Sequence, residues 1–147
     1  MIDKDFVGAK TNTRYCDVEA GRLRLFAVAT GEDDPVYLDE KAAIAAGHPA
    51  LPAPPTFMFC LGMIHPAEKN AIEHMVDSIG EVLHGEQGFE YFKMIYAGDR
   101  IAITTTTVAI DEKKGGHEVV RQVTEAINQH GELCAKAYSS IVIPNRG

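Results

Sequence analysis

An acidic loop in the first quarter of the chain carries the groups best suited to moving a proton. Glu32, Asp33 and Asp34 stand in a row ahead of Pro35, and the phenol of Tyr37 follows. Carboxylates between a helix end and a turn are either solvated turn formers or acid and base groups. A tyrosine beside them is either a packing aromatic with a hydrated hydroxyl or a partner in the same chemistry. The loop by itself leaves both interpretations open.

Histidines are the second source of chemistry, and the chain has six: His48, His65, His74, His84, His117 and His130. The only local cluster combines Glu73-His74 with His84-Gly85-Glu86, and its spacing fits no established metal-ligand pattern. We therefore expect loop or surface histidines, with no metal and no cofactor bound.

The familiar motifs of several enzyme classes are missing. The sequence has no Gly-x-Gly-x-x-Gly, no Walker loop, no Gly-x-Ser-x-Gly elbow and no His-Glu-x-x-His, which excludes nucleotide-binding folds and zincins of these types. Cys16, Cys60 and Cys134 are odd in number and far apart. We interpret them as reduced thiols that pack as small apolar side chains.

Composition predicts one globular domain over residues 1–147. The chain is 46% hydrophobic and 24% charged, and a domain of this length buries roughly 68–70% of its unfolded surface. The net charge of −7 offers no attraction for a phosphate backbone, so we expect no nucleic-acid partner. The longest mostly apolar stretch, residues 50–64, is broken by prolines and is shorter than the ~20 residues of a membrane helix. The N-terminus resembles no secretion signal, which makes the cytoplasm the expected location.

The first half of the chain predicts helices. Asp17 is placed to cap a helix over Glu19–Ala29, which Gly31 would end. Its buried face would take Ala20, Leu23, Phe26, Ala27 and Thr30. After the acidic loop, Asp39 would cap a helix over Asp39–Ala46 with Gly47 as its left-handed stop. The stretch Thr56–Ile64 is apolar almost all round, which predicts a helix buried on every side and started by Pro54-Pro55.

The second half alternates in hydrophobicity from Gly80 onward and predicts strands. The clearest are Ile101–Ile110, His117–Asn128 and Leu133–Ile143, joined by turns at residues 111–116 and 129–131. In the second of these strands Val120, Gln122 and Thr124 share one face. The expected fold is α+β: at least four antiparallel strands wrapped on one central buried helix.

Three segments of the chain resemble landmarks of the MaoC-like hot-dog hydratases and dehydratases. They are Phe26–Tyr37, Ala53-Pro54-Pro55-Thr56-Phe57 and Tyr96-Ala97-Gly98-Asp99-Arg100, and the resemblance runs from about Arg14 to Ile143. The chain is most similar to the N-terminal MaoC-type dehydratase group, which includes the non-catalytic, acyl-chain-binding subunit of heterodimeric (3R)-hydroxyacyl-ACP dehydratases. The resemblance implies a hot-dog fold, in agreement with the elements expected above.

The family's catalytic pattern, Gly-Asp-x-Asn-Pro-x-His, is altered in this chain. Gly31 and Pro35 match it, but Glu32 stands in place of the Asp, Asp34 in place of the Asn and Tyr37 in place of the His. A phenol with a pKa of about 10 is a poor base near neutral pH. The longer Glu side chain moves its carboxylate, and a misplacement of about 1 Å can cost on the order of 100-fold in rate.

A backbone donor of the family is altered as well. Active relatives offer the N–H of a glycine at the start of the central helix to the thioester oxygen, and the resemblance puts Pro55 at this position. Proline has no N–H, so the donor is absent unless Thr56 replaces it after a small shift. Along the same helix, Phe57, Met58, Cys60, Leu61 and Ile64 are candidates to line an acyl tunnel, although most would pack as core.

The resemblance implies a protomer that binds an acyl thioester of CoA or acyl carrier protein (ACP) and serves a (3R)-hydroxyacyl dehydratase or (R)-specific enoyl hydratase. A homodimer or a heterodimer with a catalytic hot-dog subunit would close its open sheet edge. One alternative is an active hydratase with rewired acid and base groups. The candidates for these groups are Glu32, Tyr37 and His84, together with Asp33, Asp34 and His48. Another is a binding module without a reaction. A thioesterase is disfavoured, because the central helix carries no ionisable residue except Cys60.

An acidic carrier protein would need a local cationic surface on this acidic chain. Arg14, Lys113 and Lys114 are candidate members of such a cluster. CoA is an equally admissible carrier.

Overall fold

The computed structural model describes residues 2–63, 72–76 and 78–145. Within these residues the chain forms an antiparallel sheet of five strands in the order β1-β3-β4-β5-β2. The strands are β1 (Arg14–Asp17), β2 (Leu83–Tyr91), β3 (Arg100–Glu112), β4 (Glu118–Ile127) and β5 (Leu133–Ile143). The expectation of at least four antiparallel strands is confirmed.

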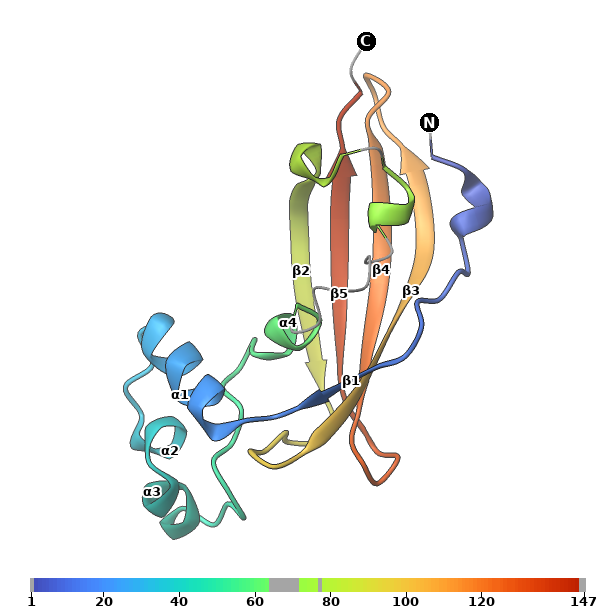
Figure 1. The fold of residues 1–147 in the computed structure, drawn as a ribbon. Helices are drawn as coiled ribbons and strands as arrows, with labels where there is room; N and C mark the ends of the chain where they lie inside the picture. The colour runs from blue at the N-terminus through green and yellow to red at the C-terminus, as the bar shows by residue number, and fades with distance from the viewer. Residues whose placement is uncertain (1, 64–71, 77, 146–147) are drawn as a thin grey trace.

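Short helices occupy one end and one face of this sheet. They are α1 (Ala20–Ala29), α2 (Pro35–Leu38), α3 (Glu40–Ala45) and α4 (Met58–Leu61), with 3-10 turns η1 (Lys4–Phe6), η2 (Ile72–His74) and η3 (Ile79–Glu81). Figure 1 shows α1, α2 and α3 gathered at the end of the sheet where β2 finishes, while the β3–β4 turn lies at the opposite end. None of the helices in the described part of the chain is long and apolar enough to span a membrane.

The strands follow the alternation of the sequence closely. β5 has the expected bounds, and Val120 and Gln122 of β4 are buried on one face. The expected turn at residues 111–116 is shorter than predicted, because Asp111 and Glu112 still pair with Val119 and Glu118 and extend β3. The glycines that close this turn, Gly115 and Gly116, have positive φ angles of 86° and 74°.

The expected cap of the first helix is wrong. Asp17 is the last residue of β1 and pairs with Arg100 of β3. The backbone of Val18 continues this extended path through hydrogen bonds with Gly98 and Asp99. Glu19 therefore takes the N-cap position of α1, and its side chain makes no capping hydrogen bond.

The main core lies between the sheet and helices α1 and α4. Leu23 and Ala27 of α1 are fully buried there, as expected, whereas Thr30 is exposed. Cys16 and Cys134 are also buried, which confirms their role as apolar packers, and burial raises the pKa of both thiols. A second, smaller cluster around Ile72, Ile110 and Val120 lies away from the first.

The central helix departs from expectation. Its described helical part is Met58–Leu61, and Ile64 lies outside the described residues. Met58 and Leu61 are buried, but Phe59 is 42% and Met63 66% exposed. The prediction of burial on every side is therefore wrong for this protomer, in which one apolar face of the segment is left uncovered.

Candidate functional site

The end of α1 fixes the direction of the acidic loop. Gly31 has a φ angle of 75°, its N–H donates to the oxygen of Val28, and the N–H of Glu32 donates to the oxygen of Ala27. This pair of hydrogen bonds is a Schellman motif, which ends a helix on a left-handed glycine. The predicted stop at Gly31 is confirmed, and it sets the point from which the Glu32 side chain leaves the helix.

The acidic loop then folds into a helix that the sequence did not predict. Asp34 accepts the N–H of Val36 over 3.0 Å, and Pro35 takes the first helical position of α2. Both features favour a helix start, because a short acceptor satisfies a free N–H and proline has none to satisfy. Glu32 braces the same loop by accepting the N–H of Asp34 over 3.1 Å.

Tyr37 lies on α2, where burial and nearby negative charge both change the pKa of its phenol. Burial, followed by the carboxylates of Glu32 and Asp34, raises the pKa of its phenol above the ordinary value. A raised pKa keeps the hydroxyl protonated at neutral pH. Tyr37 is therefore a hydrogen-bond donor in this site, and its phenolate, the form that could accept a proton, is even less populated at neutral pH than that of a free phenol.

The proline-rich segment reaches the site by pairing with the loop after β2. Ala53 donates to the oxygen of Ile95 over 2.8 Å, and Ala97 donates to the oxygen of Leu51 over 2.9 Å. This antiparallel pairing places Pro52 opposite Tyr96. It explains why two landmark segments far apart in the sequence meet in the fold.

Thr56 has an unusual backbone conformation at the start of the central segment. Its φ angle is 69°, in the left-handed region that favours glycine and is rare for a β-branched residue. Its N–H donates to the hydroxyl of Tyr91 over 2.9 Å. Thr56 thus has a backbone conformation that favours glycine and that Pro55 could not adopt, since proline is restricted to negative φ.

These elements line a partly open cavity of about 210 Å³. Its walls are mainly apolar, with two phenols and one ammonium group among them. The lining residues are Tyr37, Ala53, Pro54, Pro55, Met58, Tyr91, Lys93, Met94 and Ile95.

The family of this chain follows from comparison with known sequences. The family model of the FAS1-like dehydratase domain region matches residues 5–137. The chain belongs to this family. A UPF0336 protein of Streptomyces griseus subsp. griseus is 34% identical over 143 residues, which cover 96% of this chain and 94% of the relative.

Solved structures place the FAS1-like dehydratase domain in the MaoC-like hot-dog fold. The HadBC (3R-hydroxyacyl-ACP dehydratase) complex from Mycobacterium tuberculosis contains a chain that matches with a TM-score of 0.80 and 28% identity, over 94% of this chain and 97% of that one. The MaoC-like dehydratase from Rhodospirillum rubrum matches with a TM-score of 0.71 and 23% identity, over 96% of this chain and 94% of that one. The expected hot-dog fold is confirmed.

Two of the predicted substrate-binding residues of this dehydratase domain pack away from the cavity. Phe57 is buried in the core, where its ring meets that of Phe26 edge to face at 5.4 Å. Cys60 is half-buried against the same core, and burial raises the pKa of its thiol. Pro55 and Met58, in contrast, line the cavity.

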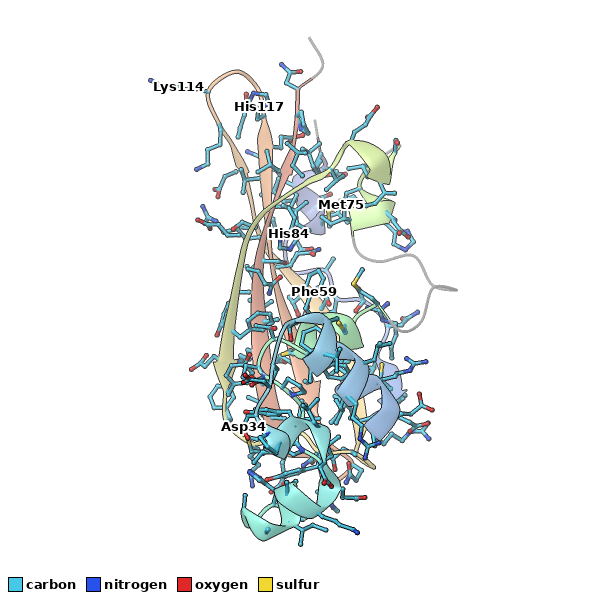
Figure 2. The ribbon with its side chains drawn as sticks, turned by 90° about the vertical axis from the view of Figure 1, so that its left-hand side faces the viewer. Asp34, Phe59, Met75, His84, Lys114 and His117 are labelled. Atoms are coloured by element: carbon cyan, nitrogen blue, oxygen red, sulfur yellow. The ribbon has the colours of Figure 1, made fainter. Side chains whose placement is uncertain are left out.

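His84 lies elsewhere on the sheet. Its ring meets that of Phe59 at 5.7 Å, so the strand does pass beside the central helix as expected. It precedes Tyr91 by seven positions on β2, which corresponds to roughly 20 Å along a strand. Figure 2 shows His84 beside Phe59 and well separated from Asp34. The structure thus brings Glu32, Asp34 and Tyr37 together without His84.

The predicted cationic cluster does not form. Arg14 pairs with Ile103 near the start of β3, whereas Lys113 and Lys114 follow the end of that strand. The two sites are roughly 30 Å apart along β3. In Figure 2, Lys114 and Asp34 lie at opposite ends of the molecule.

Sequence reasoning missed most of the cavity wall on the sheet side. Tyr91, Lys93, Met94 and Ile95 come just before the landmark at Tyr96, but nothing in their order shows that they meet the proline-rich segment. Among the described residues, no cluster of three or more His, Cys, Asp or Glu side chains is arranged to hold a metal ion.

Proposed function

We propose that this chain binds the acyl group of a CoA or ACP thioester in the cavity beside Tyr37. It would do so as a cytoplasmic protomer of a (3R)-hydroxyacyl dehydratase or (R)-specific enoyl hydratase system. The observation that carries this proposal is the mainly apolar cavity of about 210 Å³, which is lined in part by residues of two of the three landmark segments, namely Tyr37, Ala53, Pro54 and Pro55. Apolar walls with a few polar groups are typical of small-ligand sites.

The acid and base groups of the site argue for binding without chemistry in this chain. Tyr37 stands where the family has an imidazole, and its raised pKa favours the neutral phenol. Glu32 is held by the N–H of Asp34 within the loop, and Asp34 acts as the cap of α2. A partner with an intact Asp and His would carry out the reaction.

The partner would pair with the open edge of the sheet. β2 is an edge strand in the described sheet, and unpaired strand edges invite pairing with another chain. Apolar side chains are exposed on β2 and on the central segment, namely Leu83, Phe59 and Met63. A second hot-dog protomer, either a copy of this chain or a catalytic relative, would cover them. The similarity to a chain of the HadBC complex supports the heterodimer.

Calorimetric titration with octanoyl-CoA tests this proposal. We expect the chain to bind octanoyl-CoA at least about tenfold more tightly than CoA itself, because only the acyl chain enters the apolar cavity. Ala53→Phe places a ring in the cavity wall and should abolish this difference. The control is Ala9→Phe, which adds the same ring at an exposed position next to Thr107 of β3. It should leave the difference between the two affinities intact. Equal affinity for octanoyl-CoA and CoA in the unmodified protein would overturn the proposal.

A further inference from the structure

Tyr91, a residue of the cavity wall, uses its hydroxyl to accept a hydrogen bond from the backbone. The N–H of Thr56 donates to this hydroxyl over 2.9 Å. The contact depends on the left-handed backbone of Thr56, a conformation that is strained in a non-glycine residue. Because Thr56 keeps this strained conformation and its N–H has a defined acceptor, we infer that the fold maintains the contact with Tyr91.

The position of the Tyr91 ring is set by the strand that carries it. Phe89 and Tyr91 lie on the same face of β2, and their rings stack at 6.1 Å with an interplanar angle of 16°. Phe89 in turn packs against the main core. The phenol is therefore held over Thr56 by packing and not by the hydrogen bond alone.

Three other backbone donors of the lining residues are engaged as well. The N–H of Ala53 donates to Ile95, that of Lys93 to Cys134, and that of Tyr37 to Asp34. Pro54 and Pro55 have no N–H to offer. A carbonyl oxygen that entered the cavity would find these backbone donors already in use.

We propose that Tyr91 determines what this cavity recognises: its hydroxyl replaces a thioester carbonyl oxygen at the Thr56 N–H, so the cavity selects the hydrocarbon chain and not the thioester head. This inference rests on the proposed function. The side chain of Tyr91 is 53% exposed, so water competes for its own O–H proton. Exchanging that water for a carbonyl oxygen gains little free energy.

The test compares two ligands that differ in the carbonyl oxygen alone. Octanoyl-CoA is a thioester, and octyl-CoA is the thioether of the same chain length without the oxygen. In the unmodified protein we expect affinities for the two within about twofold of each other. Tyr91→Phe keeps the ring and frees the Thr56 N–H, so it should favour the thioester by about 2- to 10-fold, the ordinary worth of one hydrogen bond.

Tyr138→Phe is the matched control. Tyr138 pairs with Gly88 of β2 and donates to Glu90, so it lies on the opposite face of the sheet from Tyr91. Its loss should leave the ratio of the two affinities unchanged, and thermal melting should show that both variants are folded. An unchanged ratio in Tyr91→Phe would overturn the proposal. So would a thioester preference in the unmodified protein that Tyr91→Phe removes, since Tyr91 would then be the carbonyl's donor.

If neither protein binds an acyl-CoA, the proposed function fails, and the Tyr91 contact is tested separately by hydrogen exchange. The Thr56 amide should exchange faster in Tyr91→Phe than in the unmodified protein or in Tyr138→Phe. Equal exchange in all three proteins would show that Tyr91 does not occupy this donor.

Discussion

Asp34 holds Tyr37 in place through the first turn of α2. The backbone oxygen of Asp34 accepts the N–H of Tyr37 over 3.0 Å, and its carboxylate accepts the N–H of Val36 over 3.0 Å. The Asp34 side chain is thus a helix cap. The contacts of Asp34 fix the position of Tyr37 and do not point to a role in binding substrate.

Replacing this cap should lower stability by an amount that depends on the new side chain. We expect Asp34→Ala to lower the free energy of unfolding by about 1 kcal/mol, because the N–H of Val36 loses its acceptor. Asp34→Asn should cost only a few tenths, since Asn caps helices about as well as Asp. Asp33→Ala, at the exposed neighbouring position, is the control. Urea unfolding measures all three, and equal losses for Ala and Asn would contradict the capping role.

Thr56 and Pro55 should respond in opposite directions to substitution by glycine. Thr56→Gly removes the strain of a left-handed β-branched residue, so we expect stability to be unchanged or raised by up to about 1 kcal/mol. Pro55→Gly should lower stability by about 1 kcal/mol by freeing the unfolded chain. Thermal melting distinguishes the two. A large loss of stability in Thr56→Gly would show that its side chain, and not its backbone, matters here.

The pH dependence of Tyr37 follows from the direction of its pKa shift. The folded state raises the pKa of this phenol above 10.0, so folding favours the neutral form. Its contribution to stability is therefore complete below about pH 10 and is lost as the pH rises through the higher folded pKa. We expect Tyr37→Phe to change the free energy of unfolding equally at about pH 6 and about pH 9. A difference between these two conditions would indicate a lowered pKa and a phenolate that is populated near neutral pH.

Elements with a clear local signal could be predicted from the sequence. The stop at Gly31, the cap at Asp39 and the bounds of β5 depend on residues near one another in the chain, and the structure confirms them. The alternation of β4 likewise placed Val120 and Gln122 on the buried face.

Features that depend on distant pairing could not be predicted in this way. Asp is a residue type that commonly caps helices, and Asp17 stands just before the first predicted helix. The hydrogen bonds of Val18 with Gly98 and Asp99, however, keep the chain extended beyond Asp17. The helix α2 has only four residues, too few for a periodic pattern. The contact between Thr56 and Tyr91 joins residues 35 positions apart, and its geometry depends on a backbone angle that the threonine itself disfavours.

Restoring the family's groups together should recover some activity. Glu32→Asp shortens the side chain that carries the carboxylate by one methylene, Tyr37→His supplies an imidazole, and Tyr91→Phe frees the Thr56 N–H. We expect (R)-specific hydration of an enoyl thioester in the folded triple variant and none in the single variants, because such groups act as a unit. A folded triple variant that binds octanoyl-CoA and remains inactive would show that Glu32, Tyr37 and the Thr56 N–H do not correspond to the family's catalytic groups.

The rate at which the protein alone hydrates crotonyl-CoA tests most directly whether this chain binds acyl thioesters without transforming them. A positioned general base contributes about 100- to 10,000-fold to such a reaction. With Tyr37 in place of the imidazole, we expect a turnover at least about 100-fold below the ~10 s⁻¹ of an ordinary enzyme. A turnover within about tenfold of that value, lost in Glu32→Ala or Tyr37→Phe, would show instead that the chain is an active hydratase.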